Sequence, residues 1–112
     1  MYNFEKLTVW QKTLDFCELI YKHTKGFPKE EAFGLTAQLR RASTSILLNI
    51  SEGCACSSKR EFRHFLNIAL CSQYEVATII RLCQRLNLLV EEDYTKIGKL
   101  LHGLINSLKS DN

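Results

Sequence analysis

Proline and glycine are scarce in this chain of 112 residues, which has one Pro and five Gly. These residue types mark most turns, so their scarcity disfavours a fold built from many short segments. Strand patterns are also missing: apolar and polar residues never alternate with period two, and Val and Ile do not cluster between turn residues. We therefore exclude a strand-rich fold and expect long helices joined by short loops.

The sequence also lacks a long apolar run. No stretch approaches the roughly 18 to 20 apolar residues that span a bilayer. The first nine residues include Glu5 and Lys6 and contain no apolar signal segment. We expect no membrane association and a cytoplasmic location. The five cysteines are an odd number spread through helical patterns, which is typical of reduced thiols and not of a disulfide framework.

The overall composition is that of an ordinary globular domain. Hydrophobic residues make up 46% of the chain and charged residues 24%, which excludes disorder over the whole length. The length fits one domain spanning 1–112. The formal net charge of +3 is mildly basic, so it permits an anionic partner without requiring one.

Four segments carry apolar or small residues at alternating spacings of three and four, the period of an amphipathic helix. They predict helices at about 5–25, 30–53, 58–87 and 91–109. Glu30 and Glu31 suit the positive first turn of the second helix, and Ser58 with Glu61 has the pattern of a capping box at the third. Short loops between four such helices predict an all-α, antiparallel, up-and-down, left-handed four-helix bundle. The predicted core stripes are Leu7, Trp10, Leu14, Cys17, Tyr21 and Thr24; Leu35, Leu39, Ala42, Ile46, Asn49 and Gly53; Phe62, Phe65, Ala69, Ser72, Val76, Ile79, Cys83 and Leu86; and Tyr94, Ile97, Leu101, Leu104 and Leu108.

The second and third helices carry more apolar residues than a monomeric bundle needs, which is about three positions per heptad. A cluster of surplus apolar residues on adjoining helices favours self-association. The alternative is that these two helices simply lie centrally in the fold. The surplus residues are Leu47 and Leu48 on the second helix and Leu66, Ile68, Leu70, Ile80 and Leu82 on the third.

No catalytic or metal-binding motif is convincing. Cys54 and Cys56, followed by His64, offer three ligands, but structural zinc uses four and a wider first spacing. A di-iron bundle needs two Glu-x-x-His motifs, and the chain has one, at Glu61 and His64. Nucleophile elbows, phosphate-binding glycine loops and zinc-protease motifs are absent. We predict no enzyme activity, no metal and no cofactor.

Basic residues on the second and third helices are the remaining candidate site. Arginine binds phosphates through paired hydrogen bonds, and a tyrosine can stack on a base, so this set predicts binding to RNA or DNA. One alternative is an ordinary solvated face. Another is a structural role for Arg40 or Arg41 as the partner of Glu75, which is expected near the core; Asn49, at a core position, is expected to fix helix register. The predicted nucleic-acid-binding residues are Arg40, Arg41, Lys59, Arg60, Arg63, Tyr74, Arg81 and Arg85.

Several stretches occur in an order that covers most of the chain from Phe4 to about Leu108: LTVWQK at 7–12, FPKEE at 27–31, QLRRA at 38–42, NISEG at 49–53 and KREF at 59–62. This ordered set resembles the four-helix bundle family named for the 23S rRNA intervening sequence, also called the S23 ribosomal protein family. The chain departs from the family at Ser51, where Ala is frequent. It also departs at 54–56, where Gly and Arg are frequent, which weakens the argument for a basic loop there.

The resemblance implies a left-handed up-and-down bundle that assembles as a ring-shaped homopentamer. Some members are encoded inside insertions in 23S rRNA genes, and relatives include accessory proteins of diversity-generating retroelements that bind a reverse transcriptase and nucleic acid. The favoured function is therefore a non-enzymatic oligomer that binds RNA or DNA through basic faces. The alternative is a protein-interaction scaffold, such as a reverse-transcriptase accessory protein.

Overall fold

The computed structural model describes residues 2–111, with side chains described up to Lys109. Within that range the chain forms four α-helices and two short 3-10 helices, and no strand. This confirms the predicted all-α class. The α-helices are α1 (Thr8–Thr24), α2 (Leu35–Cys54), α3 (Lys59–Arg85) and α4 (Glu91–Asp111), and the 3-10 helices are η1 (Asn3–Lys6) and η2 (Lys29–Glu31).

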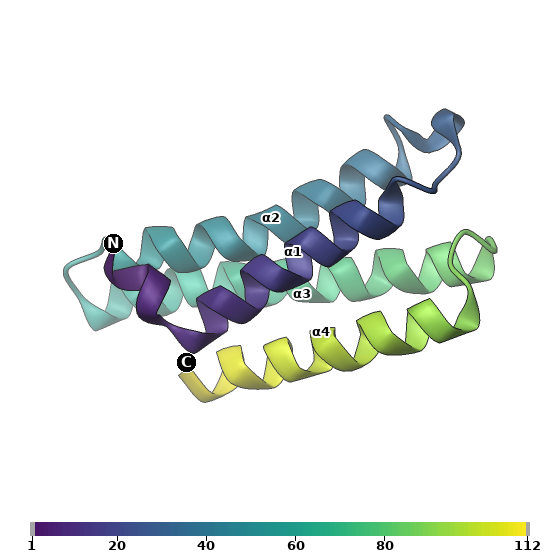
Figure 1. Cartoon of the computed structure of the whole chain (residues 1–112). Helices are drawn as coiled ribbons and strands as arrows, with labels where there is room; N and C mark the ends of the chain where they lie inside the picture. The colour runs from purple at the N-terminus through teal and green to yellow at the C-terminus, as the bar shows by residue number, and fades with distance from the viewer. Residues whose placement is uncertain (1, 112) are drawn as a thin grey trace.

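Successive helices run antiparallel, and both ends of the chain lie at one end of the bundle (Figure 1). Each helix packs against its neighbours in sequence, and α4 closes the bundle against α1. The interface between α2 and α3 is the most extensive, and that between α1 and α4 is the smallest among the four helix pairs. The up-and-down bundle is therefore confirmed, while its left-handed sense stays a prediction. Over the described residues, no helix is both long and apolar enough to cross a bilayer.

The first two α-helices begin later than predicted because the backbone leaves helical geometry before each. Leu7 is extended, with φ −74° and ψ 127°, and separates η1 from α1. Gly34 has φ −103° and ψ −113° and separates η2 from α2. The acids of η2 thus lie outside the first turn of α2, contrary to the prediction. Glu31 nevertheless caps that helix, since its Oε1 accepts a hydrogen bond from the Leu35 N–H at 3.3 Å.

Both ends of α3 follow capping chemistry. The Ser58 Oγ accepts a hydrogen bond from the Glu61 N–H at 3.1 Å, which is one of the two bonds of the predicted capping box. At the other end Asn87 adopts a left-handed conformation with φ 59°. The Leu88 N–H donates to the Cys83 carbonyl at 2.9 Å and the Asn87 N–H to the Gln84 carbonyl at 3.1 Å, the two bonds of a Schellman motif. The predicted turn at 87–90 is therefore present.

The core confirms some predicted stripes and corrects others. In α4, Ile97, Leu101, Leu104 and Leu108 are buried as predicted. In α1 the buried face is rotated: Leu14 is only half-buried and Tyr21 is exposed. The spacing alone was ambiguous there, because α1 carries a second apolar stripe that also repeats every three or four residues. The buried residues of α1 are Val9, Thr13, Phe16, Cys17, Ile20 and Thr24.

The rest of the core lies in α2 and α3. Leu66 and Ile80 are buried within the bundle, so they do not belong to a surplus outer surface. The predicted stripe residue Leu86 is instead exposed, since α3 has already ended at Arg85. The buried residues of these helices are Thr36, Leu39, Ala42, Ser43, Ile46, Ile50 and Gly53 in α2 and Leu66, Ala69, Ser72, Gln73, Val76, Ile79, Ile80 and Cys83 in α3.

A polar network joins α2 to α3. Asn49 is half-buried, and its Nδ2 donates to the Ser45 carbonyl at 2.8 Å and to the Ser45 Oγ at 3.1 Å. The Ser45 Oγ in turn shares a hydrogen bond of 2.9 Å with the Ser72 Oγ. The bond that crosses between the helices is the one from Ser45 to Ser72, whereas Asn49 bonds only within α2. A role of Asn49 in fixing register stays a prediction.

Candidate nucleic-acid interface

Six of the eight predicted site residues lie on one outer face of α3. Successive helical residues are rotated by ~100°, so these six fall within an arc of about 100°. All six are exposed. The two acids of α3, Glu61 and Glu75, fall outside this arc. We call it the α3 outer face, and its site residues are Lys59, Arg60, Arg63, Tyr74, Arg81 and Arg85.

The cations of this face form two separate clusters. Lys59, Arg60 and Arg63 lie in the first turns of α3, and Arg81 and Arg85 lie in its last turns. At 1.5 Å per residue, about 27 Å of helix separates Arg63 from Arg81. The structure therefore brings the residues into a stripe and not into a single patch.

The first cluster opposes the helix dipole. Basic side chains at a helix N-terminus face the positive end of the dipole, so their placement there does not stabilise the helix. Within residues 2–111, none of Lys59, Arg60 and Arg63 makes a hydrogen bond or an ion pair through its side chain. The free backbone N–H groups of the first turn add to the positive potential. Together these groups form a surface suited to phosphate.

The second cluster is partly tied to α4. One Arg81 Nη donates to the Gln84 Oε1 at 2.7 Å and lies 3.4 Å from the Tyr94 hydroxyl. The Gln84 Nε2 donates to the Glu91 carboxylate at 3.1 Å. Arg81, Arg85 and Glu91 line one open depression of about 640 Å³. The nearby carboxylate offsets part of the positive charge, so this cluster is the weaker anion site.

Tyr74 lies between the clusters and has a partner that the sequence did not reveal. The Lys109 ammonium, on α4, is 5.8 Å from the centre of the Tyr74 ring. This is a cation–π distance, and it adds a sixth cation beside the α3 outer face. The contact depends on how α4 lies against α3, so no local sequence pattern identifies Lys109.

Arg40 serves as a structural residue, but its partner is not the predicted one. Its Nε donates to the Thr24 Oγ1 at 2.8 Å, an Nη donates to the Tyr21 carbonyl at 3.3 Å, and the guanidinium lies 4.5 Å from the centre of the Tyr21 ring. These contacts bind α2 to the end of α1. The predicted partner, Glu75, is exposed and makes no ion pair with any residue the structure describes.

Arg41 lies away from the α3 outer face. It is exposed and lines a shallow depression of about 440 Å³ between α2 and α3. Glu52 and Glu75 line the same depression. A depression lined by two carboxylates and one guanidinium is a poor site for phosphate.

Three of the five thiols are poorly suited to nucleophilic or metal chemistry. Burial raises the pKa of Cys17 to about 11, and burial, with a smaller effect of Glu31, raises the pKa of Cys83 to about 11. Partial burial and the Glu61 carboxylate raise the pKa of Cys56. These thiols stay protonated at neutral pH, whereas nucleophiles and metal ligands are thiolates. Within the described part of the chain, no three His, Cys, Asp or Glu residues cluster as a metal site would require.

A family model described as 23S rRNA-intervening sequence protein matches residues 5–110. The chain belongs to this family. A solved structure of a protein of unknown function from the S23 ribosomal protein family of Bacteroides thetaiotaomicron is 29% identical, with a TM-score of 0.83. The similarity covers 92% of this chain and 96% of that chain. No curated protein matches the sequence.

Membership in the 23S rRNA-intervening sequence family confirms the resemblance drawn from the ordered sequence stretches. It accounts for the four-helix fold, because the Bacteroides protein has the same architecture over nearly its whole length. It assigns no activity, since that relative is itself described as having unknown function. The function of this chain must therefore be argued from its own surfaces.

Proposed function

We propose that this chain is a non-enzymatic, cytoplasmic protein that binds RNA or DNA through the α3 outer face. The observation that carries the proposal is the cluster of Lys59, Arg60 and Arg63, three exposed cations without partners at the positive end of a helix dipole. A cation placed where it does not stabilise its own helix is explained by an anionic partner. Phosphate groups fit this role, and contacts to them carry no sequence information.

The distribution of charge favours a polyanion over an ordinary solvated face. Solvated helix faces usually mix acids and bases, often in pairs three or four residues apart. The α3 outer face carries five cations, while Glu61 and Glu75 lie outside its arc. A stripe of cations about 40 Å long, the length of α3, suits an extended phosphate backbone better than a small anion.

Exposed apolar residues support assembly of several copies. Leu48 on α2 is 57% exposed, and Ile68 and Leu82 on α3 are also exposed. Such residues on adjoining helices favour an interface between copies, and the family resemblance implies a homopentamer. In a pentamer the α3 outer face would occur five times, which raises avidity without sequence specificity.

A second candidate, a protein-interaction scaffold such as a reverse-transcriptase accessory protein, is favoured by one end of the bundle. Phe33 is 99% exposed and Val90 is 65% exposed. They belong to the η2–α2 and α3–α4 connections, and both connections lie at the end opposite the chain termini (Figure 1). Exposed aromatic and aliphatic side chains in such a position suit a protein partner. A partner that co-purifies after nuclease treatment and is lost in Phe33→Ser would favour this candidate.

If the α3 outer face binds nucleic acid, RNA affinity should fall steeply with salt concentration, and removing its cations should reduce that dependence. The variant Lys59→Gln/Arg60→Gln/Arg63→Gln should bind a structured RNA more weakly than the parent protein. The slope of log K against log salt should fall by about three, because each lost phosphate contact removes about one unit. Fluorescence anisotropy at several salt concentrations measures both quantities.

A matched variant controls for net charge. Lys22→Gln/Lys25→Gln/Lys29→Gln removes the same three charges from α1 and the η2 region, and α1 does not pack against α3. It should keep the slope within about one unit of the parent value. The proposal would be contradicted if both variants lost RNA affinity equally, or if RNA affinity did not change with salt concentration.

A further inference from the structure

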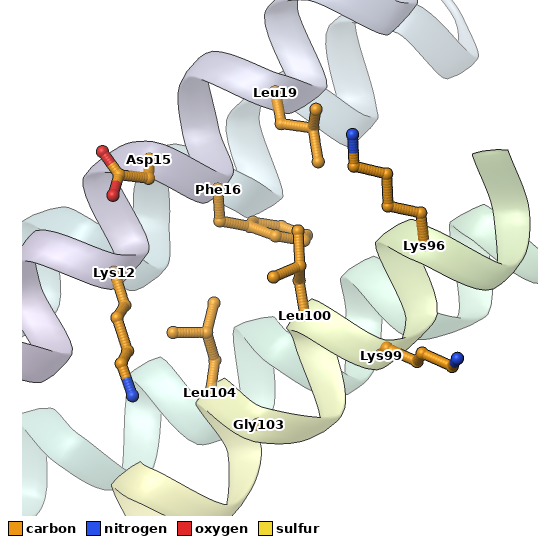
Figure 2. A pocket seen from close by; sticks show the side chains of 9 residues that line it. All are labelled: Lys12, Asp15, Phe16, Leu19, Lys96, Lys99, Leu100, Gly103 and Leu104. Atoms are coloured by element: carbon orange, nitrogen blue, oxygen red, sulfur yellow. The ribbon is translucent and has the colours of Figure 1, made fainter.

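A groove with an apolar floor opens between the first and last helices. Phe16 and Leu19 of α1 face Leu100 and Leu104 of α4 across it (Figure 2), and its volume is about 320 Å³. Phe16 and Leu104 are 2% and 3% exposed, so they belong to the core and form the floor. Leu100 is 47% exposed on the wall. The exposed apolar surface of the groove therefore comes from Leu100 and the half-buried Leu19, above a floor that the bundle already covers.

The groove exists because α1 and α4 pack least closely among the adjoining helices. Gly103 lines it on the α4 side, and a Cβ built there meets no atom within 4 Å. A glycine inside a helix costs about 1 kcal/mol relative to alanine. Gly103 therefore lowers the stability of α4 at a position where a larger side chain would project into open space beside the groove.

Positive charge surrounds this apolar floor. Lys12 of α1 and Lys96 of α4 lie at its opposite ends, and Lys99 lies on the outer rim (Figure 2). Asp15 is the one acid among the lining residues, and its carboxylate points away from the apolar side chains (Figure 2). Among the residues that the structure describes, none of the three ammonium groups forms an ion pair. Glu91 and Glu92 share a neighbouring depression with Lys96 and Lys99, so Lys12 is the cation of the groove farthest from these acids.

We propose that the groove binds a fatty carboxylate, with its alkyl chain against Leu19 and Leu100 above the buried floor and its carboxylate beside Lys12 or Lys96. The volume lies at the lower end of the ~300–1,000 Å³ range of small-ligand sites. A volume of about 320 Å³ would hold a few side chains of a partner helix and not the helix itself, which is about 10–12 Å across. Nucleic acid lacks the apolar chain that the groove accommodates. This site is separate from the α3 outer face and goes beyond the proposed function.

Decanoate, used below its micellar concentration, tests the proposal by calorimetry and by amide NMR shifts of the intact protein. The Gly103 amide should shift on titration, while the Gly98 amide should not. Gly98 is rotated by about 140° from Gly103 on the same helix, toward α3. A saturable heat with shifts confined to the groove supports the proposal. Absence of binding, or shifts spread over the whole surface, overturns it.

Two leucine variants separate the groove from general effects on α4. Gly103→Leu places a side chain in the groove and should weaken decanoate binding by about tenfold or more, equivalent to ~1.4 kcal/mol. Gly98→Leu makes the same change outside the groove, where a Cβ also meets no atom within 4 Å, and should leave binding unchanged. Equal binding by Gly103→Leu and the parent protein overturns the site.

A lysine variant tests whether the ammonium groups bind the carboxylate. Lys12→Gln/Lys96→Gln should weaken decanoate binding several-fold while leaving the neutral analogue 1-decanol unaffected. Equal loss for both ligands contradicts the assigned role of the ammonium groups. If Gly103→Leu instead changes the mass of the native protein by sedimentation, the groove is an interface between copies and the fatty-carboxylate proposal fails.

Discussion

At the scale of single residues, Gln73 stands out because it is fully buried while its side-chain Nε2 and Oε1 have no hydrogen-bond partner among the described residues. An unpaired buried amide costs roughly 1–3 kcal/mol. Gln73→Met keeps the length of the side chain and removes the amide, so it should raise the free energy of unfolding by about 1 kcal/mol or more.

Urea denaturation followed by circular dichroism measures this change. The exposed Gln38→Met should stay within about 0.5 kcal/mol of the parent protein. Destabilisation by Gln73→Met would mean that the amide has a partner in solution, for which a bound water is the natural candidate.

The neighbouring arginines of α2 differ in role, and this difference can be measured. Arg40→Gln removes two hydrogen bonds to α1 and the contact with the Tyr21 ring, so it should destabilise the protein by about 1–2 kcal/mol. Arg41→Gln changes an exposed side chain and should cost less than about 0.5 kcal/mol. Thermal melts of the two variants provide the comparison, and equal melting temperatures would refute a structural role for Arg40.

At the scale of helices, Gly53 of α2 packs tightly against two phenylalanines of α3. A Cβ built there lies 3.0 Å from Cδ1 of Phe62 and 3.1 Å from Cβ of Phe65. Gly53→Ala should therefore destabilise the bundle by about 1–2 kcal/mol, since the steric cost exceeds the ~1 kcal/mol gained in helix propensity.

Gly98→Ala is the matched change on α4, where a Cβ meets no atom within 4 Å. It should stabilise the protein by up to about 1 kcal/mol. Chemical denaturation of both variants checks the pair. Stabilisation by both would show that α2 and α3 can separate at Gly53 without loss.

The helices also show what local pattern can predict. The α4 stripe and the Ser58 cap were predictable because each depends on residues within one or two turns. The breaks at Leu7 and Gly34 were missed because the apolar stripes begin only at Leu7 and Leu35 and do not locate a helix start before them. The acids Glu30 and Glu31 suited a first turn but belong to η2. The rotation of α1 was missed because two of its stripes share the helical period and only packing selects one.

In the candidate site, too, some features could be predicted from the sequence and others depend on packing between helices. The α3 outer face follows from helical geometry alone, so its six residues could be grouped from the sequence. The Tyr21 partner of Arg40 and the Lys109 partner of Tyr74 join separate helices, and no spacing within one helix predicts them. The exposed position of Glu75 likewise depends on how α2 packs against α3.

At the scale of the whole molecule, cationic and apolar side chains are exposed on different parts of the bundle. The α3 outer face carries cations, and adjoining parts of α2 and α3 expose apolar side chains. The end opposite the chain termini exposes Phe33 and Val90 among charged residues. The burial of Leu66 and Ile80 reduces the apolar surplus predicted from the sequence. What remains exposed still favours an assembly of identical subunits, in which each copy presents one α3 outer face.

The most direct test of this account is light scattering with absorbance at 260 and 280 nm on the native protein eluting at low salt. We predict a mass that is a multiple of the 12.9 kDa subunit, with five subunits expected. Excess absorbance at 260 nm should disappear after nuclease treatment or at high salt, and the Lys59→Gln/Arg60→Gln/Arg63→Gln variant should lack it. A folded 12.9 kDa monomer that carries no nucleic acid and binds no added RNA at low salt would contradict the account.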